Sequence, residues 1–406
     1  MTTGRTIGLN VTFATVLIVA NFVCAIDITF FAISDTHYGQ TGAPSSGTGI
    51  QAKDTSRARM PGILNALPGT AYPTSIGGTI DAPRGVLLPG DLVETLDTNL
   101  WIKYTTDYGV NGEKKVHFPV YDGLGNHDQP GVSTLILSRF VARSATRQNP
   151  VNYDSAGYNY SWDWDGVHFV HLNLYAGGLE TGYFSSTGFG GNPLNSRGFL
   201  QTDLAQRVGS SGRPVFIMQH YPLTDTTYWN NSAKQQLYSI LQPYNVIGIL
   251  HGHSHAQAMY KWNNIDIYDD GTVMDGDIMV FHITDGRMVA VHRSFVGTGT
   301  SGNGQETWST LIKDKTISMG TATAITKPDG SRAGLFTVAG TSQRMPASVH
   351  SVEILDLYGH FVGRVRVSNF RAEWNRRDAK GYLAPSGIYF LRSSGQTKAF
   401  GKIALR

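Results

Sequence analysis

Short apolar runs followed by polar or glycine-rich turns recur along the chain from residue 27 to residue 295. These runs are rich in β-branched and aromatic residues, which is typical of buried strands. We expect strands over 27–34, 85–91, 116–122, 158–166, 167–175, 214–220, 246–250, 277–284 and 287–295. Segments with helical patterns lie between them, over 54–67, 98–109, 133–145, 197–209 and 233–242. Strands that alternate with helices in this way predict an α/β fold.

Five of the apolar runs end in side chains of the kinds that bind metal ions. The groups that follow them are Asp35 with His37, Asp91, Asn126 with His127, His220, and His253 with His255. In α/β folds the loops at strand ends gather at one edge of the sheet and build the active site. A strand fixes the position of each side chain, and adjacent glycines let the backbone turn tightly around a small ion. The pattern therefore predicts one metal centre assembled from distant parts of the chain.

The residue types indicate which ions such a centre would hold. Carboxylate oxygens, imidazole nitrogens and one amide oxygen suit Zn²⁺, Mn²⁺ or Fe. Ligands in this number are too many for one tetrahedral zinc ion. They suit two ions about 3.5–4 Å apart that share a carboxylate and assist an in-line displacement. We therefore expect two divalent or trivalent metal ions and a phosphate ester as substrate.

The uneven distribution of charge along the chain predicts a domain boundary near the C-terminus. The chain has 406 residues, 41% of them hydrophobic and 16% charged, which is enough for a large core in more than one domain. The net charge of +3 is too small to indicate nucleic acid as a partner. Residues 345–406 hold ten Lys/Arg and four Asp/Glu, whereas residues 26–344 carry about −4. We expect a catalytic domain over 26–296, a linker with peripheral strands over 297–344, and a C-terminal module over 345–406.

Residues 1–25 have the pattern of a secretory signal peptide. Arg5 gives the positive start, the run 11–25 is apolar, and Val23-Cys24-Ala25 has small residues at a cleavage site. The alternative is a membrane anchor, for which the run is short. Cleavage after Ala25 would remove the one cysteine, which excludes disulfides and thiolate ligands from the mature chain. We expect a secreted or surface-attached bacterial protein with no stable membrane span.

The five polar groups stand in ordered motifs. They read 35-DTH-37, 90-GDLVE-94, 125-GNHD-128, 219-QHYP-222 and 252-GHSH-255. In order and in strand context they resemble the motifs of the calcineurin-like metallophosphoesterases, and the resemblance covers roughly residues 27–295. It implies a four-layer αββα sandwich with the metals at the strand ends on one edge. Glu94 departs from the pattern, which has Asp or Asn at that position.

The resemblance also implies a role for each residue. The implied ligands are Asp35, His37 and His255 for the first ion, Asn126, His220 and His253 for the second, and Asp91 as the bridge. His127 would not be a ligand; it would stabilise the developing charge and protonate the leaving oxygen. Asp128 would orient His127. The implied reaction is hydrolysis of a phosphate mono- or diester by a hydroxide that bridges the metals.

Other polar and aromatic residues have plainer interpretations. We interpret His251 as a buried strand-end histidine and give no role to His168 or His171, which lie on opposite faces of one strand. The alternating aromatic residues of 158–164 are interpreted as core packing. Three aromatic residues in loops beside the motifs are candidates for shaping the pocket, namely Tyr38, Tyr221 and Trp229.

The C-terminal module has the pattern of a small all-β domain. Its segments 356-DLYG-359, 374-WNRRD-378, 386-SGIY-389 and 402-KIALR-406 resemble the C-terminal sorting domain of the type IX secretion system. That resemblance covers about sixty residues and implies the secretion machinery as a partner and export through both membranes. The alternative is a generic immunoglobulin-like accessory domain.

The pattern leads to a secreted phosphoesterase and leaves two alternatives open. A monoester, a diester and a nucleotide all suit the same metal centre, and the loops 38–84 and 176–196 are expected to cover the site and select among them. The more distant alternative is a non-catalytic surface protein that uses the same scaffold for binding. The complete ligand set together with His127 argues against it.

Overall fold

The fold is given by a computed structural model. It describes residues 26–43, 53–128, 134–149, 151–154, 158–177, 194–296, 305–320, 334–338, 341–345, 351–356, 360–366, 371–374, 376–378, 384–385, 387–393 and 399–405. The expected signal peptide, residues 1–25, lies outside these residues, as do parts of the two expected covering loops, 44–52 and 178–193. Within the part that is described, no helix has both the length and the apolar character needed to cross a membrane.

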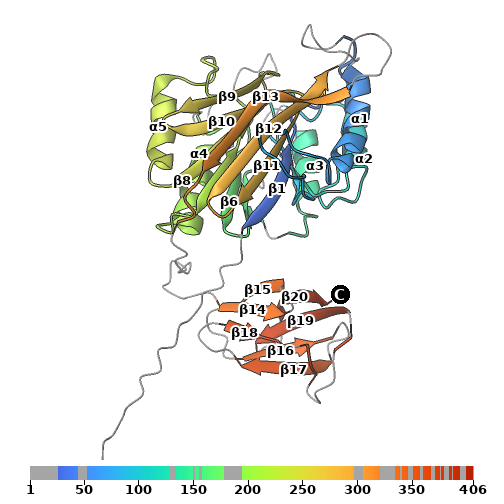
Figure 1. The fold of residues 1–406 in the computed structure, drawn as a ribbon, viewed down its shortest axis with the longest axis vertical. Helices are drawn as coiled ribbons and strands as arrows, with labels where there is room; N and C mark the ends of the chain where they lie inside the picture. The colour runs from blue at the N-terminus through green and yellow to red at the C-terminus, as the bar shows by residue number, and fades with distance from the viewer. Residues whose placement is uncertain are drawn as a thin grey trace, which may run out of the picture.

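The first sheet has six strands in the order β13-β12-β11-β1-β2-β3. Its strands are β1 (Asp27–Ala32), β2 (Val86–Leu88), β3 (Val120–Asp122), β11 (Ile278–Thr284), β12 (Arg287–Val296) and β13 (Gln305–Thr316). β1, β2 and β3 are parallel, whereas β1, β11, β12 and β13 pair antiparallel, so the sheet is mixed. β13 continues the sheet beyond residue 296, and Figure 1 shows it beside β12.

The second sheet has seven strands in the order β4-β5-β6-β7-β8-β10-β9. They are β4 (Asn152–Tyr153), β5 (Tyr160–Trp164), β6 (Val167–His171), β7 (Pro214–Met218), β8 (Asn245–His251), β9 (Gln257–Trp262) and β10 (Ile265–Asp270). The expected hairpin is present, because β5 and β6 pair antiparallel across the turn at Asp165 and Gly166. β9 and β10 were not predicted, since β9 is only half-buried and β10 carries three aspartates among its apolar residues.

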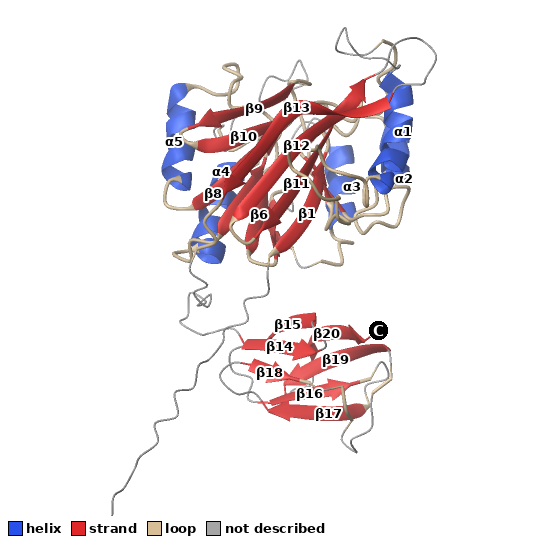
Figure 2. Ribbon diagram, viewed as in Figure 1, coloured by secondary structure: helices blue, strands red, loops and turns tan. Residues whose placement is uncertain are grey.

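In the described part of the chain, five α-helices flank the two sheets. They are α1 (Lys53–Ala66), α2 (Thr98–Asp107), α3 (Thr134–Ser144), α4 (Ser196–Asp203) and α5 (Asn231–Leu241), and a π-helical turn over Leu204–Val208 follows α4. Polar side chains cap two of the helices: Asp97 accepts a hydrogen bond from Asn99 N at the start of α2, and Asn230 accepts one from Ala233 N at the start of α5. Figure 2 shows α4 and α5 on one side of the body and α1, α2 and α3 on the other.

Aromatic side chains fill the space between the sheets. Phe30 of β1 stacks on Phe281 at a ring-centroid distance of 4.7 Å, and it meets Phe169 and Phe216 of the second sheet edge-on at 5.4 and 5.3 Å. The next residue, Phe31, points to the opposite face, as the two-residue period of a strand requires. A second core lies between the seven-stranded sheet and helices α4 and α5. The interpretation of the 158–164 aromatic run as core packing is confirmed for Tyr160, Trp162 and Trp164, which are buried.

The C-terminal part is built of strands throughout its described residues. One sheet has the order β15-β14-β18 and the other β17-β16-β19-β20. The strands are β14 (Gly334–Val338), β15 (Thr341–Met345), β16 (Ser351–Leu355), β17 (Phe361–Arg366), β18 (Arg371–Glu373), β19 (Gly387–Ser393) and β20 (Ala399–Leu405). Trp374 is buried against Tyr389 and donates a hydrogen bond to Arg377 O at 2.7 Å. Residues 357–359, 375, 386 and 406 of the sorting-domain motifs lie outside the described part of the chain.

A buried charged cluster fastens α3 to the first sheet. The Asp122 carboxylate at the end of β3 is fully buried and accepts hydrogen bonds from Arg143 Nε at 2.9 Å and Arg147 at 2.7 Å. Tyr104 of α2 donates to the same carboxylate at 2.6 Å. Two guanidinium groups therefore depend on one buried anion, and its removal leaves both without their counter-charge.

We expect Asp122→Asn to lower the free energy of unfolding by about 3–5 kcal/mol. The matched control is Asp314→Asn, which breaks an exposed pair with Arg287 at 2.8 and 2.9 Å and is expected to cost less than about 1 kcal/mol. Urea unfolding followed by tryptophan fluorescence measures both variants. Equal losses in the two variants would contradict the role of Asp122.

Candidate metal centre

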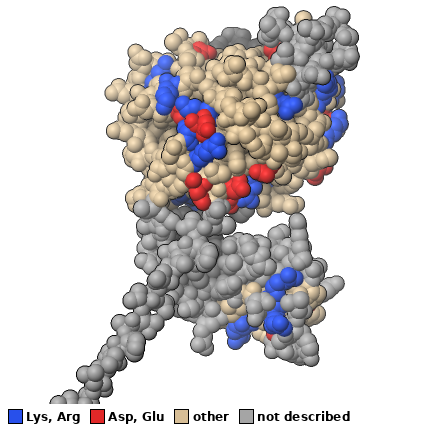
Figure 3. Space-filling view, in the orientation of Figure 1, with Lys and Arg blue, Asp and Glu red and all other residues tan. Residues whose placement is uncertain are grey.

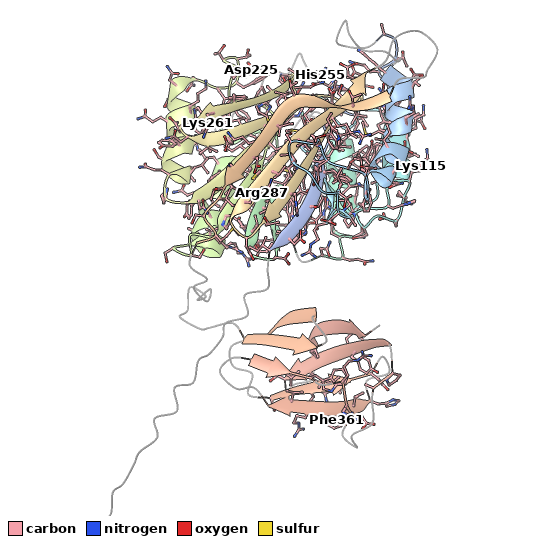
Figure 4. All side chains as sticks on the ribbon, viewed as in Figure 1. Lys115, Asp225, His255, Lys261, Arg287 and Phe361 are labelled. Atoms are coloured by element: carbon pink, nitrogen blue, oxygen red, sulfur yellow. The ribbon has the colours of Figure 1, made fainter. Side chains whose placement is uncertain are left out.

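Loops at the carboxyl ends of five strands converge on one edge of the body. β1, β2 and β3 are parallel in the first sheet, and β7 and β8 are parallel in the second. The candidate ligands that follow these strands are Asp35 and His37, Asp91, Asn126, His220, and His253 and His255. Figure 4 labels His255 at this edge, with Asp225 at the same edge.

One group of ligand atoms comes from the β1 and β8 loops. His255 Nε2 lies 3.3 Å from Asp35 Oδ1, and His37 Nε2 lies 3.6 Å from the same oxygen. The two imidazole nitrogens face each other at 3.0 Å. Asp35 and His37 are buried, whereas His255 is about one-quarter exposed, so this group opens to solvent on the His255 side.

A second group comes from the β3, β7 and β8 loops. Asn126 Oδ1 lies 2.9 Å from His220 Nε2 and 2.9 Å from His253 Nδ1. His220 is fully buried and His253 is 23% exposed. The amide oxygen is thus held between two imidazole nitrogens that come from different strands.

Asp91 stands between the two groups. Its Oδ2 lies 3.4 Å from His37 Nε2 and 3.3 Å from His220 Nε2. Its Oδ1 accepts a hydrogen bond from His127 N at 2.8 Å, which fixes the carboxylate in this position. One carboxylate therefore faces both groups, as a bridging ligand must.

The spacing of these atoms fits coordination of two ions. Two ligands of one ion lie about 3.0–3.4 Å apart when each is about 2.1 Å from it. The donor separations within the two groups run from 2.9 to 3.6 Å. Nitrogen and oxygen donors of this kind suit Zn²⁺, Mn²⁺ and Fe alike. The chain therefore provides two adjacent candidate sites that both face the Asp91 carboxylate.

The backbone at the candidate ligands is mostly left-handed. Five of them have positive φ angles: Asp35 (54°), His37 (41°), Asp91 (53°), His253 (71°) and His255 (55°). Non-glycine residues adopt this conformation at a cost on the order of 1 kcal/mol each. Hydrogen bonds between the loops hold it, including His37 N to Asp91 O at 3.0 Å. The chain keeps this strain where it turns several side chains toward one point.

Glycines make room for the carboxylates. A Cβ atom on Gly125 would lie 2.2 Å from Asp91 Oδ1, and one on Gly252 would lie 1.8 Å from Ser34 Oγ and 2.4 Å from Asp35 Oδ2. These distances are shorter than any ordinary contact, so neither position accepts a side chain unless its neighbours move. The glycines of the predicted motifs are thus required by close approach to the ligands.

Protons balance the buried charges of this group of ligands. Burial lowers the pKa of the His37 imidazole, but its contacts with Asp35 and Glu94 outweigh burial and raise the pKa to about 10. Burial and the charge of His220 lower the pKa of His253 to about 4. At neutral pH His37 therefore holds a proton that an incoming metal ion must displace.

His127 lies beside the first group and is held through Glu94. Its Nδ1 lies 3.1 Å from Glu94 O and 3.4 Å from Glu94 Oε2, and its side chain is 17% exposed. The same Glu94 carboxylate lies 2.7 Å from His37 Nδ1. The sequence had marked Glu94 only as a departure from the family pattern, and its contacts with both histidines were not predicted.

Asp128, which was predicted to orient His127, contacts backbone N–H groups of the β2 and β3 loops. Its carboxylate accepts hydrogen bonds from Leu92 N at 3.1 Å, Val93 N at 3.1 Å and Gly125 N at 2.8 Å. Burial and the charge of Asp91 raise the pKa of this carboxyl to about 7. Asp128 thus ties the β2 and β3 loops together, whereas the predicted role of orienting His127 stays a prediction.

The remaining candidates are buried around the centre. Tyr38, Tyr221 and Trp229 are all less than 7% exposed, so they pack beneath the loops. His251 is buried and contacts Gly252 O and Tyr260 Oη, each at 3.1 Å. His168 and His171 are buried, and His168 Nε2 lies 2.7 Å from Asp203. Asp225, which no pattern in the sequence indicated, lies 3.6 Å from His253 Nε2.

The sequence matches one family model. The model described as calcineurin-like phosphoesterase matches residues 28–257, which include all the residues of the centre. Among curated proteins no match was found.

Several solved structures resemble the chain weakly. GAP50, the anchor in the inner membrane complex of Plasmodium, has a TM-score of 0.43 and 10% identity, covering 72% of this chain and 89% of that chain. A predicted phosphoesterase of Streptococcus pneumoniae TIGR4 has a TM-score of 0.30 and 11% identity, covering 70% and 99%. Vps29 of Entamoeba histolytica, complexed with Zn²⁺, has a TM-score of 0.30 and 9% identity, covering 71% and 99%. Similarity at these TM-scores supports no inference about this chain.

We expect Gly125→Ala to reduce metal binding, because the added methyl group would displace Asp91. Metal content measured by elemental analysis should fall from two ions per chain toward one or none. The matched control is Gly62→Ala in α1, where a Cβ meets nothing within 4 Å; alanine there stabilises the helix by up to about 1 kcal/mol and leaves the metal content unchanged. If the Gly125→Ala variant still bound two ions per chain, metal binding would not depend on the observed position of Asp91.

Proposed function

We propose, from the premise that this chain belongs to the calcineurin-like phosphoesterase family, that it is a metal-dependent hydrolase of phosphate esters. The observation that carries the proposal is the position of Asp91 Oδ2, 3.4 Å from His37 Nε2 and 3.3 Å from His220 Nε2. A carboxylate shared by two groups of nitrogen and oxygen donors suits a two-metal site. When bound, the two ions would activate water and offset the negative charge of the phosphate.

The metal ligands have separate tasks in this proposal. Asp35, His37 and His255 hold the first ion, and Asn126, His220 and His253 hold the second. The buried members fix the positions of the ions, whereas His253 and His255, each about one-quarter exposed, border the side where substrate enters. Mn, Zn and Fe all suit this donor set.

His127 is the proposed proton donor. A carbonyl oxygen accepts hydrogen bonds but does not donate them, so the contact with Glu94 O keeps the proton on Nδ1 of His127. In this proposal Nε2 is the ring atom that faces the leaving oxygen and delivers a proton to it. The 17% exposure of the side chain is consistent with this position at the edge of the centre.

We also propose that the protein is exported. Support comes from the apolar segment 11–25 and from the sorting-domain motifs of residues 345–406. In this proposal the C-terminal strands form an immunoglobulin-like domain recognised by a type IX secretion system, and the catalytic domain is a four-layer αββα sandwich.

The export proposal predicts that the chain needs its C-terminal module to leave the cell. In a bacterium that has a type IX system, the full-length chain should appear in the medium or on the surface. A chain ending at residue 344 should stay inside. The control is the full-length His127→Gln variant, whose export should equal that of the unsubstituted chain. Equal extracellular amounts of the shortened chain would contradict the proposal.

For catalysis, we expect His127→Gln to lower the turnover of an aryl phosphate ester by at least about 10², since glutamine cannot deliver a proton. Metal content should stay at two ions per chain, because His127 is not assigned as a ligand. Hydrolysis by the Mn²⁺- or Zn²⁺-loaded protein and elemental analysis measure the two quantities. Unchanged turnover would rule out the role of His127, and no hydrolysis by the metal-loaded, unsubstituted protein would favour a non-catalytic binding protein.

A further inference from the structure

Two carboxylates border the open side of the metal centre without being assigned as ligands. Glu94 is 21% exposed, and its Oε2 lies 2.7 Å from His37 Nδ1. Asp225 is 22% exposed, and its Oδ2 lies 3.6 Å from His253 Nε2. One carboxylate thus stands beside each of the two sites. Both are open enough to act on a charged substrate.

Among the described residues, no Lys or Arg forms an ion pair with either carboxylate. Their basic partners are histidines of the centre itself, His37 and His127 for Glu94 and His253 for Asp225. Arg57 and Lys53 reach the same loop, but Arg57 donates to Thr36 O at 2.5 Å and to Gln40 O at 2.8 Å, and Lys53 donates to Gln40 Oε1 at 2.8 Å. Both cations are therefore held by the loop itself.

The stretches of the body outside the described part of the chain contain no Lys or Arg. Between residues 26 and 320 these stretches are 44–52, 129–133, 150, 155–157, 178–193 and 297–304. On the face shown in Figure 3, acidic and basic side chains are interspersed, with no extended basic area.

The charges of the loaded centre nearly cancel. Two divalent ions would bring four positive charges, and four carboxylates, those of Asp35, Asp91, Glu94 and Asp225, offset them. A monoester dianion would add two negative charges to a centre whose ions are offset by these carboxylates, whereas a diester would add one. Like charges a few ångströms apart disfavour each other strongly where water is partly excluded. The centre therefore favours the less charged substrate.

Two tyrosine rings, those of Tyr221 and Tyr228, lie beside His253, the histidine that Asp225 contacts. Tyr228 stacks on the buried Tyr221 at a ring-centroid distance of 3.7 Å and an interplanar angle of 12°. Both rings meet His253 edge-on, at 5.8 Å for Tyr228 and 4.8 Å for Tyr221. Tyr228 is half-buried and its ring lies beside His253 of the second site. Such a surface suits a carbon-containing ester group.

We propose that the substrate is a phosphodiester, with Asp225 disfavouring monoester dianions and Tyr228 contacting the ester group that is not released. This inference rests on the proposed function. Water adds to phosphorus, the bond to one ester oxygen breaks, and that oxygen takes a proton from His127. One proton of the water returns to His127 and the other passes to solvent, so the products are an alcohol and a phosphate monoester. The monoester carries one more negative charge than the substrate and is therefore the poorer substrate of the two.

The test compares bis-p-nitrophenyl phosphate with p-nitrophenyl phosphate on the metal-loaded, full-length protein. We expect kcat/KM for the diester to exceed that for the monoester by at least about tenfold. Asp225→Asn should raise kcat/KM for the monoester, because one negative charge is removed. The ratio of the diester kcat/KM to the monoester kcat/KM should therefore fall. Tyr228→Leu should lower kcat/KM for the diester more than for the monoester.

Controls separate the outcomes. Asp314→Asn makes the same change of charge at the exposed pair with Arg287, and Figure 4 shows Arg287 away from His255. This variant should leave the ratio of the diester kcat/KM to the monoester kcat/KM unchanged. A preference for the monoester would overturn this inference while leaving the hydrolase proposal intact. An equal loss on both substrates in Asp225→Asn, with the metal content intact, would overturn the charge role of Asp225. Activity on neither substrate would overturn the proposed function itself.

Discussion

The shared position of the Asp91 carboxylate is the constraint on which the rest of the structure depends. Its Oδ2 must face His37 from the β1 loop and His220 from the β7 loop at nearly equal distances. β1 and β7 belong to different sheets, so this arrangement requires the two sheets to pack face to face with matched ends. The stacked and edge-on contacts of Phe30 with rings of both sheets set that packing. The core between the sheets therefore also determines the geometry of the site.

The conformation of the ligand-bearing loops lowers the stability of the fold, and the rest of the structure must offset this loss. Five candidate ligands have left-handed backbones, and two glycines leave no room for even one methyl group beside a carboxylate. Without ions, buried carboxylates and imidazoles are balanced by protons, as the raised pKa of His37 shows. Such an arrangement persists only where the surrounding structure fixes it. The backbone hydrogen bonds between the β1 and β2 loops and the contacts of Asp128 with three N–H groups provide that fixation.

The sequence predicted those features that local pattern determines. The polar groups after β1, β2, β3, β7 and β8 were expected at one edge, because apolar strands with polar ends have a clear pattern, and the structure brings these groups together. β10 was missed because Asp266, Asp269 and Asp270 interrupt its apolar residues, although all three are buried. Asp225 was missed because nothing in its neighbours indicates that its loop folds back over His253. Contacts that depend on how a loop returns to the site leave no local pattern in the sequence.

Selectivity must come from these loop contacts, because the metal ligands alone do not distinguish one phosphate ester from another. Glu94 illustrates this point. A glutamate is one methylene longer than the Asp or Asn that the family pattern has at this position. Its carboxylate lies 2.7 Å from His37 Nδ1 and 3.4 Å from His127 Nδ1. One side chain thereby couples the position of a ligand to that of the proton donor and adds a negative charge at the rim. Asp225 adds a second charge across the centre, beside His253. Glu94 and Asp225 would offset the charge of two bound ions without occupying the positions of the ligands. In the proposed function the same two carboxylates would therefore affect both the position of the proton donor and the choice of substrate.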